Sequence, residues 1–144
     1  MQGPIRMEYR ITTDCTDVDW QTIAATLQSV AMAHYDPEVH RRAFEASHTT
    51  VFIYEGPRLL GFGRAISDGE YQGAIYDVAV IPEAQGRGIG KIIIRTILAR
   101  LPDCNLILYA APGMEGFYRK LGFGSMTTGM ARFTTSQAME KFTA

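Results

Sequence analysis

A short glycine-rich segment is the feature that most constrains this chain. The segment is Gln85-Gly86-Arg87-Gly88-Ile89-Gly90, and it lies between an apolar run ending at Pro82 and an isoleucine-rich run over residues 91–101. The first run is typical of a strand and the second of a helix. Glycines let the backbone approach a ligand closely, and the first N–H groups of a helix are unpaired and carry the positive end of its dipole. The arrangement therefore predicts an anion site that holds phosphate.

The two common nucleotide loops do not fit this segment. A Walker loop would require a glycine at Gln85 and a hydroxyl residue at Ile92. A dinucleotide fingerprint has the spacing Gly-x-Gly-x-x-Gly, whereas this chain has Gly-x-Gly-x-Gly. A different phosphate ligand is therefore expected.

The segment does match the pattern Gln/Arg-x-x-Gly-x-Gly/Ala, and it resembles the pyrophosphate loop of the GNAT superfamily of N-acetyltransferases. Val78-Ala79-Val80-Ile81-Pro82-Glu83, directly before it, is similar to the family's coenzyme A strand. Gly116-Phe117-Tyr118-Arg119-Lys120-Leu121-Gly122-Phe123 resembles a second family signature in the expected order along the chain. The resemblance covers residues 74–123. It implies an acetyl-CoA-dependent enzyme with the GNAT fold, an α/β (α+β) architecture.

Composition limits the wider possibilities. A chain of 144 residues with 47% hydrophobic side chains suits one globular domain, residues 1–144. The formal net charge of −1 offers no basic surface for nucleic acid or an anionic membrane. Residues 1–6 lack the apolar core of a leader peptide, and no apolar run reaches membrane-spanning length. Two cysteines without a metal or disulfide pattern, Cys15 and Cys104, favour reduced thiols in a cytoplasmic protein, although their pairing stays open.

Hydrophobic periodicity, together with glycine, proline and capping residues, predicts the helices and strands. Strands are expected over residues 7–13, 49–54, 58–67, 73–81, 106–110 and 126–134. Helices are expected after a capping box formed by Thr16 and Asp19, from Asp36-Pro37 to about Ala46, over 88–101, and over 114–121 with Gly122 as its stop. Residues 136–144 are expected to be a weak tail. The family fold adds a mixed, mostly antiparallel sheet of about six to seven strands, splayed at its centre and flanked by about four helices.

The resemblance assigns the coenzyme to main-chain groups. Backbone N–H groups from Gln85 to Lys91 would hold the pyrophosphate, and the Arg87 side chain would add a charged contact. Members of the family lay the pantetheine arm beside the splayed strand, here along Val78, Ala79 and Val80. The Val78 N–H would also stabilise the oxyanion of the thioester carbonyl, a type of contact worth about 3 kcal/mol in other enzymes. Many members have an asparagine where this chain has Ala111, so that contact is either missing here or made by the backbone, and Ala111 is left out of the expected set.

Tyr118 is the candidate general acid. It matches the tyrosine of the second signature, and a phenol with a pKa of about 10 stays protonated at neutral pH and can protonate a leaving thiolate. The same residue also suits a packed core position, so both interpretations stand at this point.

The general base is less determined. Family members often use a carboxylate on the strand before the loop, and Asp77 is the one carboxylate between Glu70 and Glu83. Side chains alternate along a strand, which would place Asp77 and Tyr76 on opposite faces unless a bulge intervenes. Asp77 as the base, Asp77 as a structural acid, and Tyr76 orienting a water all remain open.

The three histidines do not suggest a metal site. His34, His40 and His48 have no carboxylates at ligand spacing, and surface positions are expected for them. An aromatic set in the same region would suit an acceptor with an apolar or aromatic tail, although such residues are often core; its members are Trp20, Tyr35, Phe44 and Tyr71.

The sequence thus favours acetyl transfer from acetyl-CoA to a primary amine by direct attack in a ternary complex, without a metal. A small-molecule acceptor, either an arylalkylamine or a polyamine, is expected. The alternatives are acetylation of a protein or peptide, and a non-catalytic acyl-CoA sensor. A homodimer is an option that the resemblance adds.

Overall fold

The computed structural model describes residues 8–144, which form two compact units. The first unit ends at Ile107, and the second runs over Leu108–Ala144. Residues 1–6, where no leader was expected, and Met7, where the first strand was expected to begin, lie outside the described residues. The two units are described separately below.

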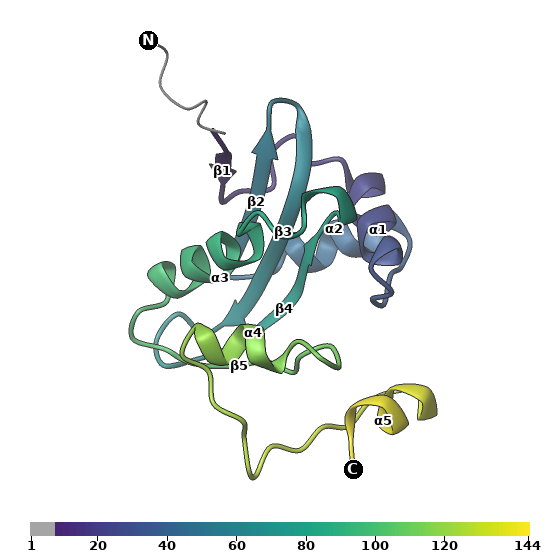
Figure 1. Ribbon diagram of the computed structural model, residues 1–144, viewed down its shortest axis with the longest axis vertical. Helices are drawn as coiled ribbons and strands as arrows, with labels where there is room; N and C mark the ends of the chain where they lie inside the picture. Colours follow the sequence, from purple (N-terminus) through teal and green to yellow (C-terminus); the bar gives the residue numbers. More distant parts are fainter. Residues whose placement is uncertain (1–7) are drawn as a thin grey trace. The chain divides into compact units, whose positions relative to one another are not determined.

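The first unit is built on one five-stranded sheet with strands in the order β1-β2-β3-β4-β5 (Figure 1). The strands are β1 (Arg10–Thr12), β2 (Thr49–Glu55), β3 (Arg58–Ser67), β4 (Gln72–Val80) and β5 (Asn105–Ile107). Neighbours are antiparallel except β4 and β5, which are parallel. The prediction of a mixed, mostly antiparallel sheet is confirmed, with five strands in place of six or seven.

The strand expected over residues 126–134 does not form, which accounts for part of that difference. This segment has no strand pairing, and its large side chains face solvent: Met126 is 59% exposed and Met130 is 99% exposed. Gly129 also interrupts the pattern. An alternating sequence makes a strand only where an edge is available to pair with it and a face is buried.

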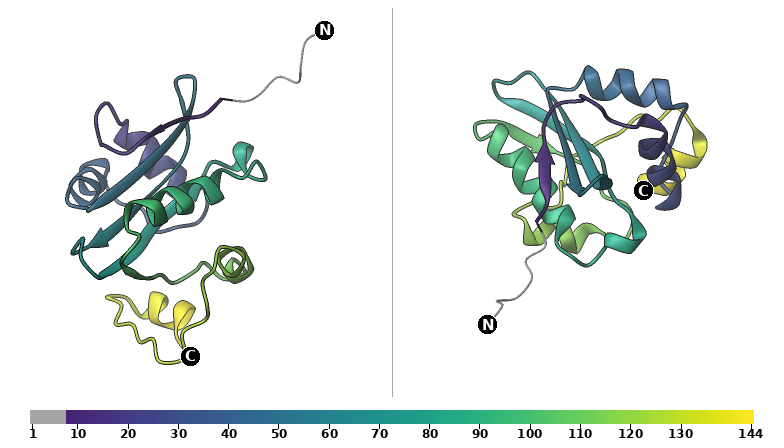
Figure 2. Two further views of the ribbon diagram at one scale, coloured as in Figure 1. Left: turned by 90° about the vertical axis from the view of Figure 1, so that its left-hand side faces the viewer. Right: turned by 90° about the horizontal axis from the view of Figure 1, so that it is seen from above.

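Helices cover both faces of the sheet. α1 (Trp20–Ser29) and α2 (Pro37–Glu45) lie on one face, and α3 (Ile89–Arg100) lies on the other, as the two views of Figure 2 show. A short 3-10 turn, η1 (Pro82–Ala84), joins β4 to the glycine-rich segment. The helices expected from Asp36-Pro37 and over 88–101 are confirmed within one or two residues. The capping box at Thr16 is wrong, because the Asp19 carboxylate itself caps α1 by accepting the N–H groups of Gln21 and Thr22.

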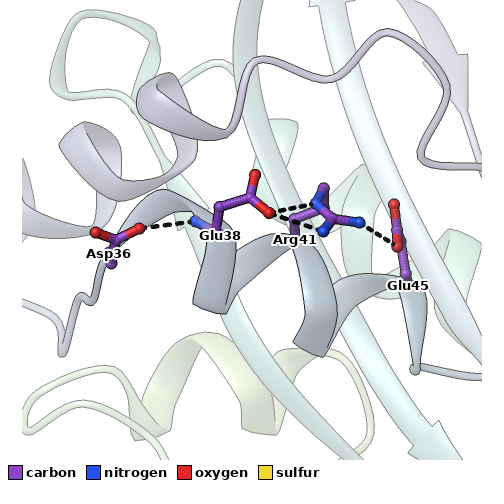
Figure 3. A network of polar contacts seen from close by, with 4 residues as sticks. All are labelled: Asp36, Glu38, Arg41 and Glu45. Atoms are coloured by element: carbon purple, nitrogen blue, oxygen red, sulfur yellow. Dashed lines mark hydrogen bonds and ion pairs between the residues drawn. The ribbon is translucent and has the colours of Figure 1, made fainter.

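The start of α2 is fixed by polar contacts along its exposed side (Figure 3). The Asp36 carboxylate accepts the Glu38 N–H at 3.1 Å, as an N-cap does. Arg41 then contacts Glu38 at 2.7 Å and Glu45 at 2.9 Å, one turn away in each direction. Such exposed pairs contribute little to stability, because solvent screens both charges. They link the first and last turns of α2 along its exposed side.

Two apolar layers hold the helices to the sheet. On the α1–α2 face, the Phe44 ring packs against Phe52 and Phe62, with centroid separations of 5.7 and 5.9 Å. On the α3 face, Gly61 and Gly63 leave room for Ile93, since a Cβ at Gly63 would lie 2.8 Å from Ile93 Cγ2. These glycines allow α3 to approach β3 closely, and α3 begins directly after the glycine-rich segment.

The second unit contains two short helices. α4 (Glu115–Lys120) ends before Gly122, whose φ of 95° is the left-handed conformation expected of a glycine stop. α5 (Ser136–Phe142) replaces the expected weak tail, so that prediction is wrong. Thr135 caps α5, and the Tyr109 ring lies 4.9 Å from the Phe142 ring and 5.3 Å from Phe133. Within residues 8–144, none of the helices has the length and hydropathy needed to cross a membrane.

Candidate active site

A β-bulge in β4 shapes the site of the first unit. The register pairs Arg64 with Tyr76 and Phe62 with Ala79, so Gly63 alone faces both Asp77 and Val78. Asp77 has a φ of 56°, a left-handed conformation that few non-glycine residues adopt, although aspartate tolerates it better than most. The extra residue breaks the alternation of side chains at this point.

The bulge places Tyr76 and Asp77 on the same face of the sheet, contrary to the simple alternation expected from the sequence. The Arg64 side chain shows this directly, because its Nε donates to Asp77 Oδ2 at 2.7 Å while its guanidinium lies 5.5 Å from the centre of the Tyr76 ring. This is also the face on which α2 lies, since the same guanidinium is 5.6 Å from the Phe44 ring.

The edge of β4 opens beyond its first residues. β4 and β5 pair only from Gln72 to Ala74, so the rest of β4 extends past its parallel neighbour. The splayed strands are therefore confirmed. Ile81 donates its N–H to Leu60 in β3 at 2.8 Å, and alternation then turns the backbone of the preceding Val80 toward the open edge. The Gln85 side chain reaches the Val80 carbonyl there at 3.2 Å.

The glycine-rich segment forms a turn that leads straight into α3. Gly86 and Gly88 have φ values of 82° and 81°, and a side chain at either would be strained although nothing lies within 4 Å. The N–H of Ile92 donates to the Gly88 carbonyl at 3.1 Å, which begins the helical ladder. The N–H groups of Ile89, Gly90 and Lys91 precede that bond, at the positive end of the helix. The Gln85 N–H donates to the Pro82 carbonyl at 3.3 Å and is therefore paired within the turn.

Charged groups of the β2–β3 hairpin lie beside this turn. Arg87 approaches the Glu55 carboxylate at 3.4 Å, and both side chains are a little over one-third exposed. Arg58 approaches Glu83 at 3.7 Å and both are more exposed. The hairpin thus pairs the one arginine of the turn with a carboxylate.

His40 is a buried residue, which corrects the expectation of surface histidines for this position. It is 3% exposed, and its Nε2 accepts the Tyr35 N–H at 2.9 Å. Burial lowers the pKa of His40, and the nearby Asp77 carboxylate opposes that effect. A neutral ring with Nε2 as acceptor therefore fastens the segment before α2. His34 and His48 are exposed, and no group of three potential ligands among residues 8–144 is placed to hold a metal ion.

The aromatic set divides into core and surface. Phe44 is fully buried, and the Trp20 ring packs 5.5 Å from it. Tyr35 and Tyr71 are 60% and 64% exposed. Only the second pair is therefore available to a ligand at the surface of the first unit.

Tyr118 lies on α4 in the second unit. Its ring packs between Phe117 and Phe123, with centroids 5.0 and 5.8 Å away. Burial raises the pKa of the Tyr118 phenol, so the proton is retained at neutral pH. The Ala111 carbonyl accepts the Met114 N–H at 2.9 Å in the turn before the helix, and Gly113 in that turn has a φ of 91°.

The sequence did not single out Arg64. One signal was available, because Arg64 is a lone charged residue inside an otherwise apolar strand, Leu59 to Ile66. A charge at such a position requires a partner. The partner itself depends on the bulge, which no local pattern marks.

The family model described as "Acetyltransferase (GNAT) family" matches residues 9–123. The chain belongs to this family. The match extends over both motifs quoted above and over parts of both units.

Relatives of the GNAT chain carry acetyltransferase names. Serotonin N-acetyltransferase 2, chloroplastic, from Oryza sativa subsp. japonica is 29% identical over 92% of this chain and 71% of its own length. An uncharacterized N-acetyltransferase ycf52 from Porphyra purpurea is 41% identical over 46% of this chain, and the match covers only 40% of that protein. Histone acetyltransferase TAP1 from Glycine max is 44% identical over 48% of this chain and 31% of its own length. The chain thus matches less than half of several of these longer proteins.

Solved structures share the fold. A probable acetyltransferase from methicillin-resistant Staphylococcus aureus superposes with a TM-score of 0.79 at 23% identity, over 89% of this chain and 99% of that one. A putative GNAT-family acetyltransferase from Xanthomonas campestris pv. campestris has a TM-score of 0.78 at 25% identity, over 88% and 94%. These likenesses establish the GNAT fold for the chain.

Proposed function

We propose that this GNAT chain transfers the acetyl group of acetyl-CoA to the primary amine of a small molecule, by direct attack in a ternary complex. The observation that carries the proposal is the junction of the open β4 edge with the glycine turn at the start of α3. A strand edge that could pair with amides and a helix end that could hold pyrophosphate follow each other within a few residues. That order suits a ligand with an amide-bearing arm joined to a pyrophosphate.

The coenzyme contacts follow from this junction. The N–H groups of Gly86 to Lys91 would bind the pyrophosphate, with Arg87 released from Glu55 to add charge. The backbone of Val78, Ala79 and Val80 would bind the pantetheine arm. Gln85 keeps its assignment to the loop through its bond to Val80, which fixes the turn against the strand. Val78, at the bulge, would direct its N–H to the thioester oxygen.

The chemistry requires two proton movements. The lone pair of the neutral amine attacks the carbonyl carbon, a C–N bond forms and the C–S bond breaks. Asp77 would accept the proton that the nitrogen loses, and Tyr118 would give its phenol proton to the departing thiolate. Both groups return to their starting protonation states through solvent. This mechanism needs no metal ion.

The mechanism draws on both units, and we propose that they act as a single GNAT domain over residues 1–144. The family match supports this, because it extends from residue 9 to residue 123 and so covers parts of both units. The homodimer stays a prediction, which sedimentation at several protein concentrations would test.

An arylalkylamine suits the acceptor side better than a polyamine. The Asp77 charge is matched by Arg64, and burial holds His40 neutral, so this cluster is formally uncharged and offers little to a polycation. The exposed Tyr35 ring, 5.6 Å from His40, adds an aromatic surface. The rice relative named for serotonin agrees with this choice.

The donor is tested first, by calorimetric titration of the purified chain with acetyl-CoA, free CoA and ATP. Saturable binding of acetyl-CoA without binding of ATP is expected. An amine panel with thiol release as the readout then follows, and tryptamine-type amines should exceed spermidine in kcat/KM. No acetyl-CoA binding at millimolar concentration by folded protein would overturn the proposal.

The same panel separates the alternatives. A histone-tail peptide is included because the soybean relative is named a histone acetyltransferase. Turnover of the peptide alone would favour protein acetylation. Binding of acetyl-CoA without turnover of any amine or peptide would favour a sensor domain.

A further inference from the structure

Outside the glycine-rich turn, the guanidinium of Arg64 is held by polar and aromatic groups from several elements. It extends from β3 with 15% of its side chain exposed, and its Nε donates to Asp77 Oδ2 at 2.7 Å. Its Nη1 donates to Ser47 Oγ at 3.2 Å, just after α2. The rings of Phe44 and Tyr76 lie 5.6 and 5.5 Å from the guanidinium carbon. Strand β3, strand β4 and the end of α2 therefore all fix this one group.

Ser47 is itself oriented for this contact. Its hydroxyl donates to the Ala43 carbonyl at 2.7 Å, which uses its one proton and leaves its lone pairs for Arg64. The contact with Ser47 therefore helps to orient the guanidinium plane of Arg64 toward the Asp77 carboxylate. A lysine could not reproduce this, because its ammonium lacks the rigid fork of donors.

The contact with Asp77 is one-sided. Arg64 binds Oδ2, and among residues 8–144 no hydrogen bond to Asp77 Oδ1 is present. The Asp77 side chain is 22% exposed, so Oδ1 belongs to a carboxylate that solvent or a ligand can reach. The carboxylate is thus held at one oxygen, and its side chain keeps a surface that solvent or a ligand can reach.

The backbone conformation of Asp77 makes its side-chain direction depend on the contact with Arg64. Asp77 lies in the bulge with a φ of 56°, where the ladder with β3 gives it no partner residue. Its side-chain direction is therefore determined by its contacts rather than by the pleat of the strand. Arg64 is the residue whose bond selects that direction.

We propose that Arg64 is a positioning residue for acetyl transfer: it holds Asp77 by Oδ2 so that Oδ1 faces the amine of the acceptor. This inference rests on the proposed function, in which Asp77 accepts the proton of the attacking nitrogen. Arg64 itself touches neither substrate. It acts through the carboxylate, and its removal leaves the coenzyme loop intact.

A double-mutant cycle tests this role, using the full chain as wild type, Arg64→Met, Asp77→Asn and the double variant. Arg64→Met should lower kcat at saturating substrates at least 10-fold, with the acetyl-CoA dissociation constant within twofold of wild type. Asp77→Asn should lower kcat at least as far. In the Asp77→Asn background, Arg64→Met should cost no more than a further twofold, because the carboxylate through which it acts is already gone.

A merely structural arginine would give a different cycle. Its loss would lower kcat by the same factor in the wild-type and Asp77→Asn backgrounds, and that result would overturn the proposal. Arg95→Met, which removes an exposed arginine from α3, is the matched control and should keep wild-type kcat. If Arg64→Met does not fold, Arg64→Lys enters the same cycle, and its effect on kcat should likewise be largely lost in the Asp77→Asn background.

Failure of the proposed function has its own signature. If the wild-type chain acetylates no amine or peptide, acetyl transfer itself is wrong. If the wild type is active and Arg64→Met retains its full kcat, only the positioning role is wrong.

Discussion

Replacing Tyr118 by phenylalanine separates catalysis from folding more cleanly than any other change in this chain. The ring contacts with Phe117 and Phe123, at 5.0 and 5.8 Å, are kept by a phenylalanine. Within residues 108–144 the Tyr118 hydroxyl makes no hydrogen bond, so its removal leaves no partner unsatisfied in that unit. We therefore expect the free energy of unfolding to change by no more than about 0.5 kcal/mol.

The effect on turnover should be much larger. A positioned general acid contributes about 10²–10⁴ in rate. Burial raises the pKa of Tyr118 above its ordinary value of 10.0, whereas a thiol such as that of cysteine has a pKa of about 8.5. Proton transfer to the thiolate is thus energetically uphill, which places the expected loss at the lower end of the range. We predict a fall in kcat of about 100-fold, equivalent to about 2.7 kcal/mol.

The assay combines three measurements on wild type and Tyr118→Phe. Thiol release at saturating acetyl-CoA and amine gives kcat, titration calorimetry gives acetyl-CoA affinity, and thermal unfolding gives Tm. Affinity and Tm should stay unchanged while kcat falls. Because burial raises the phenol pKa above its ordinary value of 10.0, any decline of wild-type kcat caused by Tyr118 ionisation should have its midpoint above pH 10, and the variant should lack that decline.

A variant that keeps more than one-fifth of the wild-type kcat would refute the role of general acid. A large fall in Tm would show instead that Tyr118 is mainly a packing residue. The two outcomes are distinguished by the same set of measurements.

Three further changes test other parts of the site. Gly88→Ala should destabilise the fold by about 1–2 kcal/mol through its φ of 81°, lowering Tm and weakening acetyl-CoA binding, and an unchanged Tm would contradict the strain. Glu55→Gln should strengthen acetyl-CoA binding by up to about fivefold at low salt by releasing Arg87, and weaker binding in calorimetry would show that Glu55 supports the turn instead. His40 has a lowered pKa, so the unfolded chain takes up this proton first and stability is lost as pH falls below about 6.5. His40→Gln, whose amide oxygen can still accept the Tyr35 N–H, should unfold in urea with a smaller difference between pH 7.5 and pH 5, and an equal difference would exclude His40 as the source.

Much of the local structure could be predicted from sequence because its causes are local. The start of α2 follows from Asp36 followed by a proline, and the end of α4 from Gly122. The glycine turn and α3 follow from consecutive residues and an apolar periodicity. Where the causes were not local, the predictions failed: the segment expected as a strand over 126–134 makes no strand pairing and leaves Met126 and Met130 exposed.

The chain of residues 78–91 by itself determined that a strand, a glycine turn and a helix end meet, and with them the family and the expected donor. Only the tertiary structure decided the acceptor side. The bulge that places Tyr76 and Asp77 on one face is a mismatch in length between β3 and β4, and it exists only when the two strands pair. The bond from Arg64 to Asp77 and the burial of His40 likewise join residues far apart in the chain. The hydrophobic periodicity of a segment indicates which face of that one helix or strand is buried. The direction of a side chain at a bulge depends instead on the residue that the neighbouring strand places beside it.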